Sequence, residues 1–158
     1  MTTVRFAELA DIPALISLAR QMHVQSRFAW MVFDSDHLWQ YLEQIIPSKR
    51  HCLIVAGGAN AADGAPLIGL LSAAVQPYAF SKDFMAQIDH LYVLPSERGS
   101  PVVMKMMAGL RKWASNREVT EITITNHFGI DERRSAKFLK KLGLSTVGGI
   151  YSMWAARK

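Results

Sequence analysis

One stretch near the middle of the chain, residues 91–103, constrains the fold more than any other. An apolar run ends at Pro95, a polar turn containing Gly99 follows, and a helical pattern begins after that turn. A strand–turn–helix junction leaves backbone N–H groups unpaired at the positive end of a helix, which suits a phosphate-bearing ligand. We therefore expect a sheet whose middle strand leads into a crossover helix, with an anion site where that helix begins.

The composition is that of an ordinary soluble protein. The chain has 158 residues, of which 50% are hydrophobic and 20% charged, and we expect a single domain over residues 1–158. No apolar run approaches the roughly 20 residues of a membrane-spanning helix, and the first residues lack the apolar core of a signal peptide. The single cysteine, Cys52, excludes an internal disulfide. These features predict a cytoplasmic protein with no membrane segment.

The charge pattern leaves several kinds of partner open. A net charge of +5 favours a phosphorylated cofactor, a nucleic acid or an acidic surface, or it reflects a mildly basic solvated surface. Neither zinc ligands nor paired aromatic residues typical of nucleic-acid modules occur, so a nucleic-acid partner is the weakest of these alternatives. The histidines show no metal-ligand spacing, and we expect no metal. They are His23, His37, His51, His90 and His127.

Hydrophobic periodicity and turn residues predict the order β-α-α-β-β-β-α-β-α-β, with room for a further strand. A run of antiparallel strands followed by strand–helix–strand implies an α/β (α+β) protein. We expect a mixed, mostly antiparallel sheet of six or seven strands with helices on both faces. Strands are predicted at residues 3–6, 51–56, 67–75, 84–94, 121–125 and 150–155, and helices at 12–23, 36–46, 101–114 and 131–142.

Three segments carry a resemblance to a known family. Residues 86–95 resemble a central strand that ends in Val-x-Pro, and residues 98–103 stand where that family has Arg/Gln-x-x-Gly-x-Gly/Ala. Residues 135–144 resemble a last helix that ends Lys-Leu-Gly. In this order the segments resemble the GNAT superfamily of N-acetyltransferases, over nearly the whole chain. The resemblance implies the GNAT acyl-CoA N-acyltransferase fold, with acetyl-CoA as cosubstrate.

The resemblance also implies where acetyl-CoA binds. Its pantetheine arm is expected along the central strand, against the backbone of Leu91, Tyr92 and Val93. The pyrophosphate is expected on the junction and on the start of the next helix, at Arg98, Gly99, Ser100, Val102 and Val103.

The junction departs from the family pattern at two positions. Pro101, expected as the first helical residue after a Ser100 cap, removes an N–H donor. Val103 places a branched side chain where the family tolerates little more than a methyl group. We expect the phosphates to sit slightly outward and to bind with modest affinity; the alternative is a helix start that no longer holds pyrophosphate.

Acetyl transfer needs a deprotonated amine, and the resemblance suggests which groups handle its proton. Gln87 replaces a glutamate that many relatives carry and cannot accept a proton, whereas Asp89 and His90 fall where other relatives carry acidic residues. We predict Asp89 and His90 as the catalytic pair; the alternatives are a solvated carboxylate and a hydrogen-bonded histidine. The family's tyrosine acid falls at Leu139, so the proton donor remains open between tyrosines and solvent. The tyrosines are Tyr78, Tyr92 and Tyr151.

Aromatic residues predict the acceptor side of the site. Phe28 and Trp30, between the first two helices, and Tyr78 are predicted to wall the acceptor pocket; packing or a homodimer contact is the alternative for the segment at 28–33. His127 is a further polar candidate, or a loop residue. The basic face of the last predicted helix is either solvated or meets the 3′-phosphate of CoA. That face comprises Arg133, Arg134, Lys137, Lys140 and Lys141.

Two functions remain open from the sequence. The first is a small enzyme that moves acetyl from acetyl-CoA to the amine of a small acceptor. The second is a GNAT-fold binding or structural module with weak or no catalysis, resembling GNAT-like proteins encoded by bacteriophages. CoA binding and thiol release with a panel of amines distinguish the two.

Overall fold

The computed structural model describes residues 2–58, 64–125 and 128–155. Its strands are β1 (Thr3–Phe6), β2 (His51–Gly57), β3 (Gly69–Pro77), β4 (Phe84–Val93) and β5 (Val119–Ile124). Its helices are α1 (Ile12–Gln25), α2 (Ser35–Ile45), α3 (Val102–Ser115) and α4 (Glu132–Lys141), with short 3₁₀ turns η1 (Leu9–Asp11) and η3 (Pro95–Glu97).

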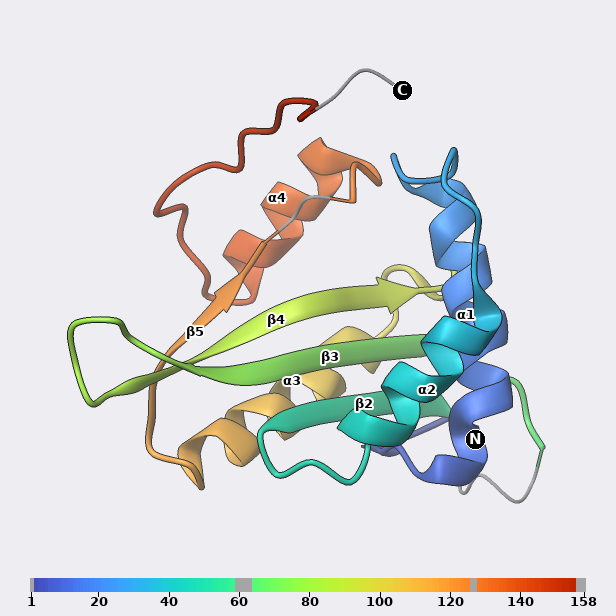
Figure 1. The fold of residues 1–158 in the computed structure, drawn as a ribbon, viewed down its shortest axis with the longest axis horizontal. Helices are drawn as coiled ribbons and strands as arrows, with labels where there is room; N and C mark the ends of the chain where they lie inside the picture. The colour runs from blue at the N-terminus through green and yellow to red at the C-terminus, as the bar shows by residue number, and fades with distance from the viewer. Residues whose placement is uncertain (1, 59–63, 126–127, 156–158) are drawn as a thin grey trace.

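The strands form one mixed sheet in the order β1-β2-β3-β4-β5. The first four pair antiparallel, and β5 pairs parallel to β4 after the α3 crossover. Figure 1 shows α2 in front of this sheet, α3 behind it, and α4 beside the end of β5. The predicted mixed sheet with helices on both faces is confirmed.

Each face of the sheet carries its own hydrophobic cluster. One cluster joins the α3 stripe, with Met106 and Leu110 fully buried, to alternate residues of β2 and β4. The other joins α1 and α2 to the opposite face, where Val55 is fully buried. Residues of β2 alternate between the two clusters, which is why that strand reads as a continuous apolar run.

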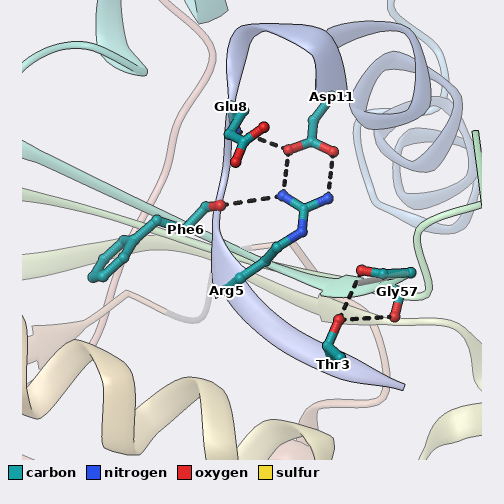
Figure 2. A network of polar contacts seen from close by, with 7 residues as sticks. Thr3, Arg5, Phe6, Glu8, Asp11 and Gly57 are labelled. Atoms are coloured by element: carbon teal, nitrogen blue, oxygen red, sulfur yellow. Dashed lines mark hydrogen bonds and ion pairs between the residues drawn. The ribbon is translucent and has the colours of Figure 1, made fainter. Parts of the chain in front are cut away.

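A partly buried ion pair anchors the first strand to the first helix (Figure 2). Arg5 donates two hydrogen bonds to the Asp11 carboxylate, at 2.7 and 2.8 Å, and the Glu8 N–H donates a third at 2.8 Å. Burial would raise the pKa of Asp11, but these hydrogen bonds and the Arg5 charge outweigh it and hold the pKa below its ordinary value. Asp11 therefore stays ionised at neutral pH and fixes the turn into α1.

Two sequence expectations are corrected. The strand predicted at 150–155 does not form; the described sheet has five strands rather than six or seven, and side chains such as Tyr151 and Met153 are more than 90% exposed. Alternating apolar residues produce a strand only where a sheet edge pairs with them. The third helix begins at Val102, one residue later than predicted, with Pro101 at the N-cap.

Within the described residues, no helix combines the length and apolar character needed to cross a bilayer. In the same part of the chain, no three His, Cys, Asp or Glu side chains come together in a way that suits a metal ion.

Candidate active site

The main cleft opens where β4 extends beyond its pairing with β5. In the described part of the chain, the parallel pairing extends to Ile88 and Ile124, while β4 continues to Val93 along β3. A cavity of about 420 Å³ lies in this gap, between β4, the end of β5, the start of α3 and one side of α4. β4 and β5 therefore part toward their C-terminal ends. The β4 backbone edge at residues 91–93, beyond the pairing with β5 in the described residues, is a template for an extended ligand.

A β-bulge at Asp89 determines which side chains enter the cleft. Ser72 of β3 pairs with His90 and Ala73 pairs with Ile88, so Asp89 is the extra residue in β4. A bulge reverses the alternation of side chains beyond it. Ile88 packs in the α3 cluster before the bulge, whereas Tyr92 packs in the α1/α2 cluster after it. Asp89 lines the main cleft.

Asp89 has two polar neighbours, one on its own strand and one on α2. The Gln87 side chain donates a long hydrogen bond of 3.5 Å to its carboxylate. Tyr41 of α2 lies within its electrostatic reach: partial burial, and then the Asp89 charge, raise the pKa of the Tyr41 hydroxyl. Tyr41 therefore remains a protonated hydrogen-bond donor at neutral pH.

His90 follows Asp89 in the bulge but lines a different cavity. It lines a small cavity of about 70 Å³ under α1 and α2, together with Ser72 and Tyr41. Its Nδ1 shares a 2.8 Å hydrogen bond with the Ser72 hydroxyl, and its ring lies 5.1 Å from that of Phe128, a wall residue of the main cleft. The predicted catalytic pair is thus divided between two neighbouring cavities, both of which are also lined by Met22.

The junction between β4 and α3 closes the other end of the cleft. Gly99 has φ +97°, a conformation that side-chain-bearing residues rarely adopt. Arg98 donates a 3.1 Å hydrogen bond to Gln25 of α1, which in turn donates one of 2.8 Å to the Tyr92 hydroxyl. This chain of hydrogen bonds orients Arg98 beside the start of α3, where helix N–H groups lack intrahelical acceptors.

The altered junction residues are accommodated in different ways. The Ser100 hydroxyl accepts a weak 3.4 Å bond from the Val102 N–H, and Val102 is buried in the core. Val103 lines the cleft, yet it is only 7% exposed and packs in the α3 cluster. Its branched side chain therefore occupies the core more than the space of the turn.

The structure places most predicted cofactor residues around one cavity. Of these residues, the cleft lining includes Leu91, Tyr92, Val93, Arg98, Gly99 and Val103, and it leaves out Ser100 and Val102. Tyr92 is also the one tyrosine of the three proton-donor candidates that lines the cleft.

The three residues predicted to wall the acceptor pocket do not lie together. Phe28 packs against Phe128, with ring centroids 5.6 Å apart, and so lies one ring behind the cleft. Trp30 is 53% exposed and contacts Trp154 of the C-terminal segment. Tyr78 donates a 2.6 Å hydrogen bond to Glu121, near the opposite end of β5. His127 lies outside the described residues.

Several residues beside β4 and the two cavities were not singled out from the sequence. Tyr41, Ser72 and Gln25 meet β4 only through long-range packing, so no local motif marks them. Positive charge on the last helix was noted, but not which side chains face the cleft; these are Arg134, Lys137 and Lys141. Helical phase offered a signal for grouping them.

Comparison with solved structures shows the same fold. The aminoglycoside N-acetyltransferase AAC(6')-Iy, solved with the bisubstrate analogue CoA-S-monomethyl-acetylneamine, is 17% identical, with coverage of 100% of this chain and 99% of that chain and a TM-score of 0.77. Glucosamine-6-phosphate N-acetyltransferase from Arabidopsis thaliana is 14% identical, with 99% of each chain covered and a TM-score of 0.75. The 6'-N-acetyltransferase AAC(6')-Ih from Acinetobacter baumannii is 16% identical, with 100% of each chain covered and a TM-score of 0.75.

At these identities the likeness concerns the fold alone. No curated protein sequence gives a significant match. The profile of the acetyltransferase (GNAT) family matches residues 14–144, which include α2, α3, α4 and the whole cleft. The chain therefore belongs to the acetyltransferase (GNAT) family.

Proposed function

We propose that this protein is a CoA-dependent N-acyltransferase that moves acetyl from acetyl-CoA to the amine of a small acceptor by direct transfer. The main support for the proposal is the cleft beside β4. It lies where β4 extends beyond its pairing with β5, and it reaches the start of α3. The residues fit a CoA ester. Amides of a pantetheine arm pair with the open β4 edge as an added strand would, and the α3 start receives the pyrophosphate.

The bulge sets the place of the chemistry. The acceptor amine attacks the thioester carbonyl carbon, a C–N bond forms, the C–S bond breaks, and CoA leaves as a thiolate. Asp89 and His90 flank this position from the two cavities and accept the proton that the amine nitrogen loses. The thiolate takes a proton from solvent or from a tyrosine hydroxyl, of which Tyr92 lines the cleft.

The structural neighbours suggest which acceptors to test first. Their titles name glucosamine-6-phosphate and aminoglycosides, all amines on sugar rings. We therefore propose an amine panel that begins with amino sugars, aminoglycosides and simple alkylamines. Thiol release from acetyl-CoA is measured for each amine.

Activity is expected to rise between about pH 6 and 8, as a larger fraction of the acceptor amine is deprotonated. Asp89→Asn and His90→Ala are each expected to lower kcat/KM, by about 10²-fold if the side chain acts as the base. A folded double variant with unchanged kcat/KM would remove both groups from the mechanism. Lys49→Ala, an exposed residue outside both cavities, is the matched control.

One observation favours a second candidate, a GNAT-fold binding module without efficient catalysis. Leu139 lines the cleft on α4 and cannot donate a proton, and Gln87 beside Asp89 cannot accept one at neutral pH. A protein that binds CoA in calorimetry but releases no thiol with any amine would support the module. A folded protein that gives no heat at millimolar CoA would contradict the proposed transferase.

A further inference from the structure

The small cavity beneath α1 and α2 is mainly apolar. Its volume is about 70 Å³, against about 420 Å³ for the main cleft. Aliphatic side chains from α1, α2, β2 and β3 form its inner end, and each of them is at most 7% exposed. They are Leu15, Leu42, Ile45, Leu53 and Leu70. A ligand that reaches this end exchanges water for hydrocarbon.

Polar groups belong to the other parts of the small cavity. Ser72 and His90 are cross-strand neighbours at the bulge and share their 2.8 Å hydrogen bond. Tyr41 is 41% exposed and therefore lies at the mouth. The described residues that line this cavity include no Asp, Glu, Lys or Arg, so a bound ammonium group would find no carboxylate among them.

The small cavity adjoins the place assigned to the chemistry. Met22 lines both cavities, and the His90 ring lies 5.1 Å from that of Phe128 in the main cleft. Asp89, the residue before His90, lines the main cleft. A nitrogen at the bulge therefore has the small cavity on one side and the main cleft on the other.

We propose that the acceptor is a short alkyl primary amine, with its hydrocarbon chain in the small cavity and its nitrogen at the bulge. This inference rests on the proposed function. A water molecule takes about 30 Å³ of liquid volume, so the cavity holds a chain of roughly two to four carbon atoms. Each methylene group buried there is expected to improve binding about fourfold.

The reaction balances with acetyl-CoA as the only other reactant. The amine nitrogen forms a bond to the acetyl carbonyl carbon, the C–S bond breaks, and CoA leaves as a thiolate. The proton that the nitrogen loses passes to Asp89 or His90. The product is a neutral N-alkylacetamide.

The lining disfavours two other classes of amine. An amine on a sugar ring brings hydroxyl groups that would exchange water for aliphatic side chains, which is unfavourable. A diamine that enters the cavity brings its second ammonium group to the apolar inner end, where burial of an unpaired charge is costlier still. Both classes are therefore expected to be poorer acceptors than a monoamine of matched length.

A series of amines tests the chemical class of the acceptor. Thiol release from acetyl-CoA is measured with methylamine, propylamine, butylamine and octylamine, and each rate is corrected for the fraction of free amine. The value of kcat/KM is expected to rise about fourfold per methylene up to propylamine or butylamine and to rise no further at octylamine. Butylamine is expected to exceed 1,4-diaminobutane and glucosamine at least tenfold.

Two substitutions on α1 test the place of the alkyl chain. Ala19 is half-buried in the lining of the small cavity, and Ala19→Leu fills part of that space. It is expected to raise the KM of butylamine about tenfold and to leave that of methylamine within about twofold. Ala14→Leu makes the same change at a half-buried position outside both linings and is the matched control. Neither variant is expected to change CoA binding in calorimetry.

A third variant enlarges the cavity instead of filling it. Leu38 is half-buried in the lining, and Leu38→Ala is expected to move the preference from butylamine toward hexylamine. Circular dichroism and melting curves verify that each variant is folded.

The outcomes separate the inference from the proposed function. Faster transfer to glucosamine or 1,4-diaminobutane than to butylamine overturns the inference and leaves the transferase proposal standing. An equal rise in the KM of butylamine in Ala19→Leu and Ala14→Leu also overturns the inference alone. No thiol release with any amine from the folded protein overturns both.

Discussion

The two helices that flank the cleft are held in very different ways. α3 buries seven of its side chains, among them the fully buried Met106 and Leu110, whereas no side chain of α4 is buried. Phe138 and Leu139 give α4 a half-buried stripe, and its end is joined to α3 through Arg111. The cleft thus has one wall built into the core and one wall attached to its surface. The first suits fixed N–H groups for a pyrophosphate, and the second suits long cationic side chains that adapt to their ligand.

The largest difference is expected from truncations in the two helices. Leu110→Ala is expected to lower the free energy of unfolding by about 3–5 kcal/mol, because a fully buried side chain leaves a cavity in the core. Phe138→Ala, on the half-buried stripe of α4, is expected to lower it by about 1–2 kcal/mol. Urea denaturation measures both. Equal losses would mean that α4 is as much a part of the core as α3.

Asp11→Asn is expected to lower the free energy of unfolding by about 3 kcal/mol, since it leaves the Arg5 guanidinium without its buried partner (Figure 2). The pKa of Asp11 is lower in the folded protein than in the unfolded chain. The stability from this ion pair is therefore present above the unfolded pKa, near 4, and is lost as the pH falls through the folded value.

The difference in stability between wild type and Asp11→Asn is accordingly expected to shrink below about pH 4. CoA binding at neutral pH, measured under conditions where the variant is folded, is expected to be unchanged, because Asp11 lies outside the cleft. A constant difference from pH 7 to pH 3 would contradict the assigned role of the ion pair.

A smaller effect on stability, with a larger one on binding, is expected from Gly99→Val. A Cβ at this position meets nothing within 4 Å, but φ +97° is strained for valine, at a cost of about 1–3 kcal/mol. The turn is expected to relax and to move the N–H groups at the start of α3, so that CoA binding is lost while the fold remains.

Gly64→Val is the matched control for that substitution. Gly64 also has a positive φ, +60°, with open space around its Cβ position, and it lies between β2 and β3, outside the cleft lining. It is expected to share the loss of stability and to retain CoA binding in calorimetry. Loss of binding in both variants would show that global stability, rather than the turn, controls affinity.

The parts that the sequence predicted well are those determined by local periodicity. The α3 stripe, the apolar run of β2 and the punctuation at Pro95 and Gly99 each reflect near neighbours along the chain, and all of them have their predicted place. The orientation of Asp89 and His90 at the bulge depends on a register shift against β3, which no local pattern encodes. The arrangement of Gln25, Tyr92 and Arg98 likewise depends on how α1 packs across the sheet.

The C-terminal segment also shows that a local sequence pattern does not by itself determine the structure. Its alternating residues predicted a strand, but pairing depends on a sheet edge at the right place, and Ile150 and Trp154 are largely exposed. The side of α4 that faces the cleft also follows from docking onto the α3 cluster rather than from the α4 sequence alone.

Thiol labelling tests directly whether the two walls of the cleft, α3 and α4, open separately. Cys52 is 1% exposed in the α3 cluster, and burial raises the pKa of its thiol to about 12, so it is expected to react with thiol reagents only when that core opens. Leu142→Cys in a Cys52→Ala background puts a thiol at the end of α4, at a position 3% exposed. Because α4 is held by a half-buried stripe, this thiol is expected to be labelled at least tenfold faster than Cys52 at pH 8, although both sites are buried. Bound CoA is expected to slow the labelling of this α4 thiol if the cofactor contacts both α3 and α4. Equal labelling rates without ligand would mean that the walls open together, and the contrast between a built-in and an attached wall would be wrong.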